Sequence, residues 1–202
     1  MTAENHSEGL KLHGYEVLLC ATGGIACYKA ADLASRLTQA GAGVSTAMSE
    51  AAVRFVAPLT FQTLTGRQVF TSLWQSAETY DPHHISLTEG ADLMVVAPAT
   101  ADILAKMACG IADDLVSTLA LSASGACDIL AAPAMNTRMW LADATQENVA
   151  KLTRRGVRFV GPGEGRLACG TTGPGRMAEP EEILAAATKL LLRNPPKHKA
   201  GK

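Results

Sequence analysis

The chain has 202 residues, of which 48% are hydrophobic and 18% charged, and its formal net charge is −1 at pH 7. This length suits one well-cored α/β domain and is short for two. The near-neutral charge argues against nucleic acid as a partner, and no stretch has the length of a membrane span. The five cysteines lack CxxC spacing, which argues against a zinc site or a disulfide framework and favours a reducing, cytoplasmic compartment.

Apolar runs alternate with helical patterns along most of the chain. We predict strands at 16–21, 44–48, 93–97, 129–132 and 157–160, and helices at 25–39, from about 51, at 101–110, 115–123, 143–155 and 181–192. Almost continuous apolar strands separated by helices are typical of a parallel sheet with helices on both faces. The predicted fold is a single doubly wound α/β domain, Rossmann- or flavodoxin-like, over residues 15–192. We expect a flexible N-terminal tail over 1–14, without a signal peptide, and a disordered C-terminal tail over 193–202.

Three loops that follow predicted strands carry residues suited to a ligand. Thr22-Gly23-Gly24-Ile25 ends the first strand, and its glycines let backbone amides approach an anion near a helix N-terminus. The spacing is not GxGxxG, so a mononucleotide phosphate fits better than a dinucleotide, and an empty glycine turn is the alternative. Ser49 binds the same phosphate or caps its helix. Thr100-Ala101-Asp102 follows the third strand, so the three loops predict a shared ligand at one sheet edge.

The segment 133–140, PAMNTRMW, follows the predicted strand 129–132. Ligand crevices of open α/β sheets lie at the carboxyl ends of the strands. Two thioethers, an indole and one amide suit a flat aromatic cofactor beside a small polar substrate. The alternative is a strand-to-helix loop whose Met and Trp side chains plug the core.

Two further segments carry candidate chemical groups. His83 and His84 stand together, but no Asp, Glu or His at ligand spacing accompanies them, so we expect no metal. His84 is either an acid/base residue or a surface histidine. The glycine-rich segment 163–177 has the length of a lid and carries Cys169 at its middle. Either the thiol of Cys169 delivers a proton to the substrate, or the segment is an ordinary loop in which the cysteine has no function. We attribute the other four cysteines to packing, and assign Lys29 no role in phosphate binding.

Five segments resemble, in this order, those of the homo-oligomeric flavin-containing cysteine decarboxylase family: TGGIACYK (22–29), HISL (84–87), APATAD (97–102), PAMNTRMW (133–140) and ACGTTGPGRM (168–177). The resemblance covers about residues 15–190. It implies that FMN binds through Gly23, Gly24, Ile25, Ser49, Thr100, Ala101, Asp102 and Ala134. Many relatives have Asn where this chain has Asp102, and an ionised carboxylate only accepts hydrogen bonds.

The same resemblance implies the roles of the remaining site residues. His84 is the acid/base residue beside the flavin, Asn136 holds the substrate carboxylate or its amide, and Cys169 is the proton donor. The substrate is further contacted by Met135, Ala168, Gly170 and Arg176. The resemblance also implies a homotrimer, or a dodecamer of trimers, with FMN near the subunit interface.

The activity implied by the resemblance is decarboxylation of 4′-phosphopantothenoylcysteine to 4′-phosphopantetheine in coenzyme A biosynthesis. Its steps are oxidation of the thiol to a thioaldehyde, loss of CO2 and re-reduction of the enethiol. Alternatives are a peptidyl-cysteine decarboxylase acting on a peptide C-terminus, a non-catalytic flavin-binding regulatory subunit, and a flavin prenyltransferase. Arg166 and Arg176 favour a phosphorylated substrate. A single-domain enzyme and the amino-terminal piece of a fusion with a downstream synthetase both fit this sequence.

Overall fold

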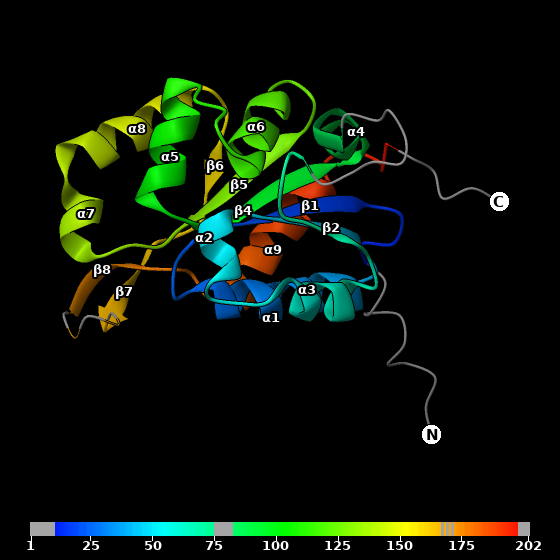
Figure 1. Ribbon diagram of the computed structural model, residues 1–202, viewed down its shortest axis with the longest axis horizontal. Coiled ribbons are helices and arrows are strands. Elements are labelled where there is room, and N and C mark those ends of the chain that lie inside the picture. Colours follow the sequence, from blue (N-terminus) through cyan, green and yellow to red (C-terminus); the bar gives the residue numbers. More distant parts are fainter. Residues whose placement is uncertain (1–10, 75–82, 167, 169, 171, 198–202) are drawn as a thin grey trace.

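Six strands form one parallel sheet in the computed structural model, which describes residues 11–74, 83–166, 168, 170 and 172–197 (Figure 1). The strand order is β3-β2-β1-β4-β5-β6, and every neighbouring pair is parallel. The strands are β1 (Glu16–Ala21), β2 (Gly43–Met48), β3 (Val69–Phe70), β4 (Leu93–Ala99), β5 (Asp128–Pro133) and β6 (Arg158–Phe159). This is the order of a doubly wound Rossmann sheet, which confirms the predicted fold class.

Helices cover both faces of the sheet (Figure 1). One face carries α1 (Cys27–Gln39), α3 (Pro58–Thr65) and α9 (Pro180–Leu191), and the other α4 (His83–Gly90), α5 (Ala101–Cys109), α6 (Leu115–Ser122) and α8 (Asp143–Arg154). Each face of the sheet has its own hydrophobic core, and successive residues of a strand pack into the two cores in turn. In β1, Val17 and Leu19 pack on the first face, and Leu18 and Cys20 pack on the second. Because both faces are covered, the strands are apolar almost throughout, which explains why the sequence predicted them.

Short elements complete the carboxyl edge of the sheet. These are α2 (Glu50–Val53), α7 (Thr137–Leu141), and a separate antiparallel hairpin of β7 (Gly163–Arg166) and β8 (Thr172–Arg176). The hairpin replaces the glycine-rich lid loop that the sequence predicted. It packs on α7 and extends beyond the ends of the main strands (Figure 1).

Four elements of the main domain were absent from the sequence prediction: α3, β3, α4 and α7. Each has eight residues or fewer, too short for a clear hydrophobic period. The strand predicted over 93–97 continues to Ala99, because the ladder shifts register after Val96 and resumes where Ala99 pairs with Pro133. In α1 the helix begins at Cys27, two residues later than predicted, so Ile25 belongs to the preceding turn.

Both chain ends of the described region are attached to the domain more closely than the sequence suggested. Leu12, assigned to a flexible tail, is fully buried, and its N–H donates to Ala40 O at 2.9 Å. Residues 193–197, assigned to a disordered tail, are held because Tyr15 Oη donates to Asn194 O at 2.8 Å and Lys197 N donates to Asp92 Oδ1 at 2.8 Å. Residues 11–14 and 193–197 therefore belong to the folded domain rather than to its tails. Over that described part, no helix is both long and apolar enough for a membrane span.

Candidate functional site

A cleft of about 1220 Å³ opens at the carboxyl ends of β1, β2, β4 and β5. The strand order reverses between β1 and β4, and such switch points are where open α/β sheets bind ligands. The cleft brings together these residues that the sequence singled out: Gly23, Gly24, Ile25, Ser49, Thr100, Ala101, Asp102, Ala134, Met135, Asn136, Ala168 and Arg176.

The β1 and β4 ends are tied together across the switch point by Thr22. Its Oγ1 donates to Pro98 O at 2.6 Å and accepts from Thr100 N at 3.3 Å. The next residue, Gly23, passes so close to α2 that a Cβ there would lie 2.3 Å from the Cβ of Ala51 and 3.0 Å from its carbonyl carbon. Glycine is therefore required for the loop to follow this path along the floor of the cleft.

Two hydroxyl-bearing residues of the cleft cap the helices that follow them. Ser49 Oγ accepts from Ala52 N at 3.2 Å and Thr100 Oγ1 from Ile103 N at 3.4 Å. The capping role predicted for Ser49 is confirmed. A capping oxygen still has a proton to donate, so these hydroxyls also have a donor for a ligand in the cleft.

Asn136 is held where β5 leaves the sheet and the hairpin begins. Ala134 N donates to Ala99 O at 3.0 Å, and Met135 N donates to Gly175 O at 2.9 Å. The Oδ1 of Asn136 caps α7 by accepting from Arg138 N at 2.8 Å. The main chain on both sides of Asn136 is thus fixed, which is the requirement for a side chain that orients a substrate.

The hairpin root is pressed against this segment at Gly175. Its φ of +132° lies in the region that favours glycine, and a Cβ there would lie 2.3 Å from Met135 O. Only glycine lets β8 reach the backbone of residue 135. The glycine-rich composition that the sequence associated with mobility therefore serves close packing at this end of the hairpin.

The charged side chains on the two sides of the cleft differ in net charge, with more carboxylates on the α5 side and more cations on the α1 side. On the α5 side, Lys106 Nζ lies 2.8 Å from Asp114 Oδ2, 2.9 Å from Asp113 Oδ1 and 3.5 Å from Asp102 Oδ2. Burial acts to raise the pKa of Asp114, but hydrogen bonds from Lys106 and Ser117 outweigh it and hold this pKa below its usual value. Hydrogen bonds to Asp114 and Asp113 raise the pKa of Lys106, and its hydrogen bond to Asp113 lowers the pKa of that carboxyl, so Lys106, Asp113 and Asp114 are charged at neutral pH.

On the α1 side lies Lys29, to which the sequence gave no role. Its side chain is 7% exposed and lines the cleft, and Nζ donates to Glu179 Oε1 at 3.0 Å and to Met177 O at 3.1 Å. The sequence did not predict this contact, because Glu179 lies 150 residues after Lys29 in the chain. A buried lysine is almost always paired, and here its partner comes from the start of α9.

Three site predictions are not tested by this geometry. Cys169 lies outside the described residues, and so does the side chain of His84, although its backbone belongs to α4. Two later residues of α4, Ser86 and Leu87, line a separate pocket with Glu16 and Ser45. Gly170 is exposed and is not among the described residues that line the cleft.

The four described cysteines differ in burial. Cys20 and Cys27 are fully buried, and burial raises the pKa of both thiols, as it does for Cys127. Full burial of Cys20 and Cys27 agrees with the packing role predicted for them, and Cys127 is half-buried. The prediction of a packing role was wrong for Cys109, which is exposed at the end of α5. Within the described ranges, no group of three or more His, Cys, Asp or Glu side chains is placed to hold a metal ion.

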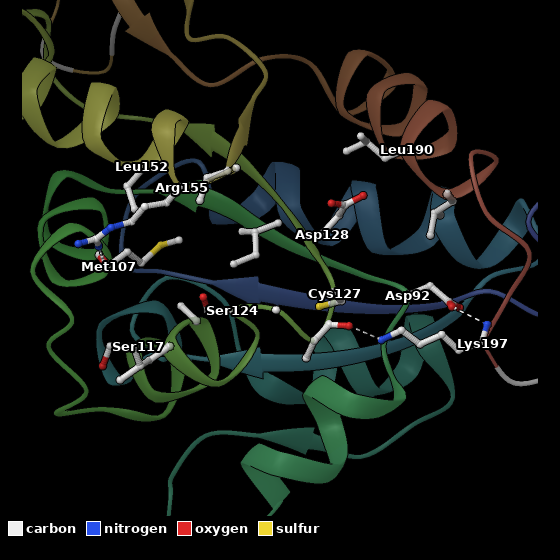
Figure 2. Close-up of a pocket in the computed structure, with 18 of the residues that line it drawn as sticks. Asp92, Met107, Ser117, Ser124, Cys127, Asp128, Leu152, Arg155, Leu190 and Lys197 are labelled. Carbon is white, nitrogen blue, oxygen red and sulfur yellow. Dashed lines mark hydrogen bonds between the residues drawn. The ribbon is translucent and has the colours of Figure 1, made fainter.

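A second cavity, of about 470 Å³, lies at the amino ends of β4 and β5 (Figure 2). Two of its cations, Lys197 and Arg155, are bonded to backbone carbonyls. Lys197 Nζ donates to Ala91 O at 2.6 Å, Ala126 O at 2.7 Å and Glu89 O at 3.3 Å. Arg155 Nη1 donates to Ala108 O at 2.9 Å and Met107 O at 3.3 Å, near the C-terminus of α5.

The sequence profile of the flavoprotein family matches residues 5–192. Among curated proteins, the coenzyme A biosynthesis bifunctional protein CoaBC of Vibrio vulnificus is 45% identical over 184 residues, which are 91% of this chain and 45% of that protein. The chain thus spans less than half the length of this relative.

Solved structures of similar fold include two decarboxylases. A mutant of PPC decarboxylase complexed with pantothenoylaminoethenethiol superposes with a TM-score of 0.79 and 29% identity, over 90% of this chain and 100% of the other. The FMN-dependent cysteine decarboxylase SpaF gives a TM-score of 0.75 and 28% identity, over 89% and 96% of the two chains.

Proposed function

The chain belongs to the flavoprotein family, and we propose that it decarboxylates 4′-phosphopantothenoylcysteine to 4′-phosphopantetheine in coenzyme A biosynthesis, with FMN as cofactor. The observation that carries this proposal is the cleft at the switch point, which joins the loops expected to hold FMN to Asn136 and the hairpin root in one cavity. The similarity to PPC decarboxylase over the whole of that chain, and to CoaBC over most of this one, supports the substrate.

The residues of the cleft fit FMN in size and in chemistry. A volume of about 1220 Å³ exceeds the range of about 300–1,000 Å³ of ordinary ligand sites, so flavin and substrate fit side by side. A Cβ added to Gly24 would meet only Thr100 Cγ2, at 3.8 Å, so the backbone there is open to a phosphate. The proposed FMN contacts are Gly23, Gly24, Ile25, Ser49, Thr100, Ala101, Asp102 and Ala134. Bound FMN would supply the hydride acceptor with which the substrate thiol is oxidised, creating the electron sink that its carboxylate lacks.

The chain's own residues would orient the substrate and manage protons. The amide of Asn136, fixed by β5 and the hairpin, would hold the substrate carboxylate until CO2 leaves. Met135 and Met139 would keep water from the reacting carbon, since both thioethers line the cleft. In this proposal His84 is the acid/base residue and Cys169 the donor that protonates the enethiol carbon. Ala168, Gly170 and Arg176 would contact the remainder of the substrate.

We expect the active unit to be a homo-oligomer, a trimer or a dodecamer of trimers, with FMN near the subunit interface. Large apolar side chains that are more than half exposed support this expectation, among them Tyr28 on α1 and Leu59 on α3. Mass photometry of the purified protein tests the assembly. A role in coenzyme A biosynthesis, with cysteines in no disulfide pattern, favours the cytoplasm as its location.

The second candidate is a peptidyl-cysteine decarboxylase, favoured by the likeness to SpaF. That enzyme would share the fold and the flavin but would need a groove for a peptide. The cations Lys29 and Arg176 at the cleft favour a small anionic substrate instead. Activity on a peptide ending in cysteine, and none on 4′-phosphopantothenoylcysteine, would select this second candidate.

The test combines the flavin spectrum of the purified protein with mass spectrometry of its products. We expect bound FMN and loss of the mass of CO2 from 4′-phosphopantothenoylcysteine. Cys169→Ser should still decarboxylate but accumulate the enethiol, because the final protonation fails. His84→Asn should keep FMN and lose the first half of the reaction. Purified protein without flavin, or with flavin and no CO2 release from either substrate, contradicts the proposal.

A further inference from the structure

Three charged side chains meet beside the cleft at the root of the hairpin. Lys29 Nζ donates to Glu179 Oε1 at 3.0 Å, and Arg176 Nη2 donates to the same oxygen at 2.5 Å. Lys29 comes from α1, Arg176 from the end of β8 and Glu179 from the residue before α9. Two cations that both line the cleft therefore converge on one oxygen of a single carboxylate.

This cluster has an excess of positive charge. Two cations and one carboxylate leave a formal net charge of +1, and hydrogen bonds from Lys29, followed by the charge of Arg176, hold the pKa of Glu179 below its usual value. An ammonium has three N–H donors and a guanidinium five. Within the described part of the chain, the side-chain contacts use two donors of Lys29 and one of Arg176. Charge and donors thus remain for an anion in the cleft.

The opposite side of the cleft has the opposite excess. Lys106 faces Asp102, Asp113 and Asp114, so one cation and three carboxylates leave a formal net charge of −2. These residues belong to α5 and the segment before α6, on the other face of the sheet from α1. An anionic group entering the cleft is repelled from the α5 side and attracted to the α1 side. The cleft therefore orients an anionic ligand.

Contacts with Gly165 and Glu179 fix the position of the Arg176 side chain beside the cleft. Its Cδ and Nη1 lie over Gly165 of β7, each 3.4 Å from the position that a Cβ would occupy there. The guanidinium is thereby laid across the hairpin with one amino group on Glu179 and its side chain 47% exposed. A guanidinium binds carboxylate and phosphate through two parallel hydrogen bonds, so its free edge matches either group.

We propose that Lys29 and Arg176 form a subsite for one anionic group of the substrate, an inference that rests on the function proposed above. The substrate named there has a carboxylate at one end and a phosphate at the other, and both present the oxygens that this subsite recognises. Oriented binding of one end places the thiol within the cleft. Lys29 is then a specificity-determining residue of a site in which the sequence gave it no part.

The test measures binding of three probes that lack the thiol and do not react, by titration calorimetry of the FMN-loaded protein. They are 4′-phosphopantothenoylserine, pantothenoylserine and 4′-phosphopantothenoylethanolamine, which have both anions, the carboxylate alone and the phosphate alone. Arg176→Gln should weaken two of the three by about tenfold to a hundredfold and leave unchanged the one that lacks the recognised anion. An unchanged pantothenoylserine identifies the phosphate, and an unchanged ethanolamine probe identifies the carboxylate. Equal weakening of all three, or of none, overturns the proposal.

Matched variants separate the subsite from the fold. Arg36→Gln removes another cation of α1, which pairs with Asp32 and with Glu181 of α9 outside the cleft, and should leave all three affinities unchanged. Lys29→Gln should repeat the selective loss; if this buried substitution prevents folding, Arg176→Gln alone decides. Arg176→Lys keeps the charge without the planar fork and should fall between wild type and Arg176→Gln.

The subsite and the proposed function can fail separately. Wild-type protein that releases no CO2 but binds the probes with a selective dependence on Arg176 retains the subsite and loses the function. Wild-type protein that releases CO2, with probe affinities indifferent to Arg176→Gln, retains the function and loses the subsite.

Discussion

The two cavities of this domain lie at opposite ends of the same strands and differ in what their charged groups do. Lys197 and Arg155 both line the amino-end cavity (Figure 2). The ammonium of Lys197 has three donors and contacts three backbone carbonyls, and Arg155 is bonded to two more. In the carboxyl-end cleft, Lys29 and Arg176 share one carboxylate oxygen. Three backbone carbonyls thus match the three donors of Lys197, whereas the described contacts of Lys29 and Arg176 leave donors unused.

The two cavities differ in volume, about 470 Å³ against about 1220 Å³, and in the bonding of their cations. Both contain charged, polar and apolar side chains, and both are open to solvent. The amino-end cavity lies where residues 193–197 contact the rest of the domain, so its polar contacts stabilise the fold. The carboxyl-end cleft lies at the switch point, where loops of independent strands meet. Substitutions in the first should therefore change stability, and substitutions in the second activity.

The largest expected contrast is between two glycines with positive φ. Gly175→Ala forces a Cβ against Met135 O, so the hairpin root must shift and kcat/KM should fall about a hundredfold. Gly125→Ala, in the amino-end cavity at φ +81°, meets no atom within 4 Å. It should cost about 1 kcal/mol of unfolding free energy and leave kcat/KM unchanged. Assays of CO2 release and urea unfolding check both, and a similar loss of activity in the two variants would contradict the contrast.

A pair of isosteric charge changes makes the second comparison. Asn136→Asp keeps an oxygen to cap α7, so stability should change by less than about 0.5 kcal/mol. The new charge repels an anionic substrate, and kcat/KM should fall by about tenfold to a hundredfold. Asn194→Asp places the same change at the amino-end cavity, where Asn194 uses only its backbone oxygen in the bond from Tyr15, and activity should not change. Steady-state kinetics of the two variants decide the point.

Lys197→Met tests the fastening role of the amino-end cavity. The variant keeps an apolar stem but leaves three carbonyls without their shared donor. Because these groups are partly exposed to water, the loss should be about 1 kcal/mol of unfolding free energy, with kcat/KM unchanged. Thermal and urea unfolding measure the effect. A fall in kcat/KM without a fall in stability would assign Lys197 to function instead.

The smallest expected effect is the dependence of the unfolding free energy on pH below about pH 4. The pKa of Asp114 is lowered in the folded state, so its contribution to stability is present above its ordinary pKa near 3.8 and is lost as the pH falls through the folded value. Asp114→Asn keeps the cap of α6 without this titration, and should lose about 1 kcal/mol less than wild type on acidification below about pH 4. The loss caused by Lys197→Met should not change over the same pH range, since backbone carbonyls do not titrate there. Urea unfolding at several pH values tests both statements.

Local patterns in the sequence were sufficient for the main elements. β1 was predicted at both of its ends, because a continuous apolar run followed by Thr-Gly-Gly defines a buried strand and its turn. The gathering of Gly23, Ser49, Thr100 and Asn136 at one edge also followed from the sequence, since parallel strands all end on the same side. Short elements such as α7 lacked enough residues for a recognisable period, and so were missed.

The sequence by itself determined five of the six strands of the sheet, its two covered faces and the edge at which the candidate site lies, because hydrophobic period is a local property. Only the tertiary structure decided which charges meet there. Lys29 and Glu179 are 150 residues apart, and their contact depends on α1 packing beside α9. The ordering of residues 193–197 likewise depends on carbonyls at the amino ends of other strands. Contacts of this kind arise from packing, and no local pattern encodes them.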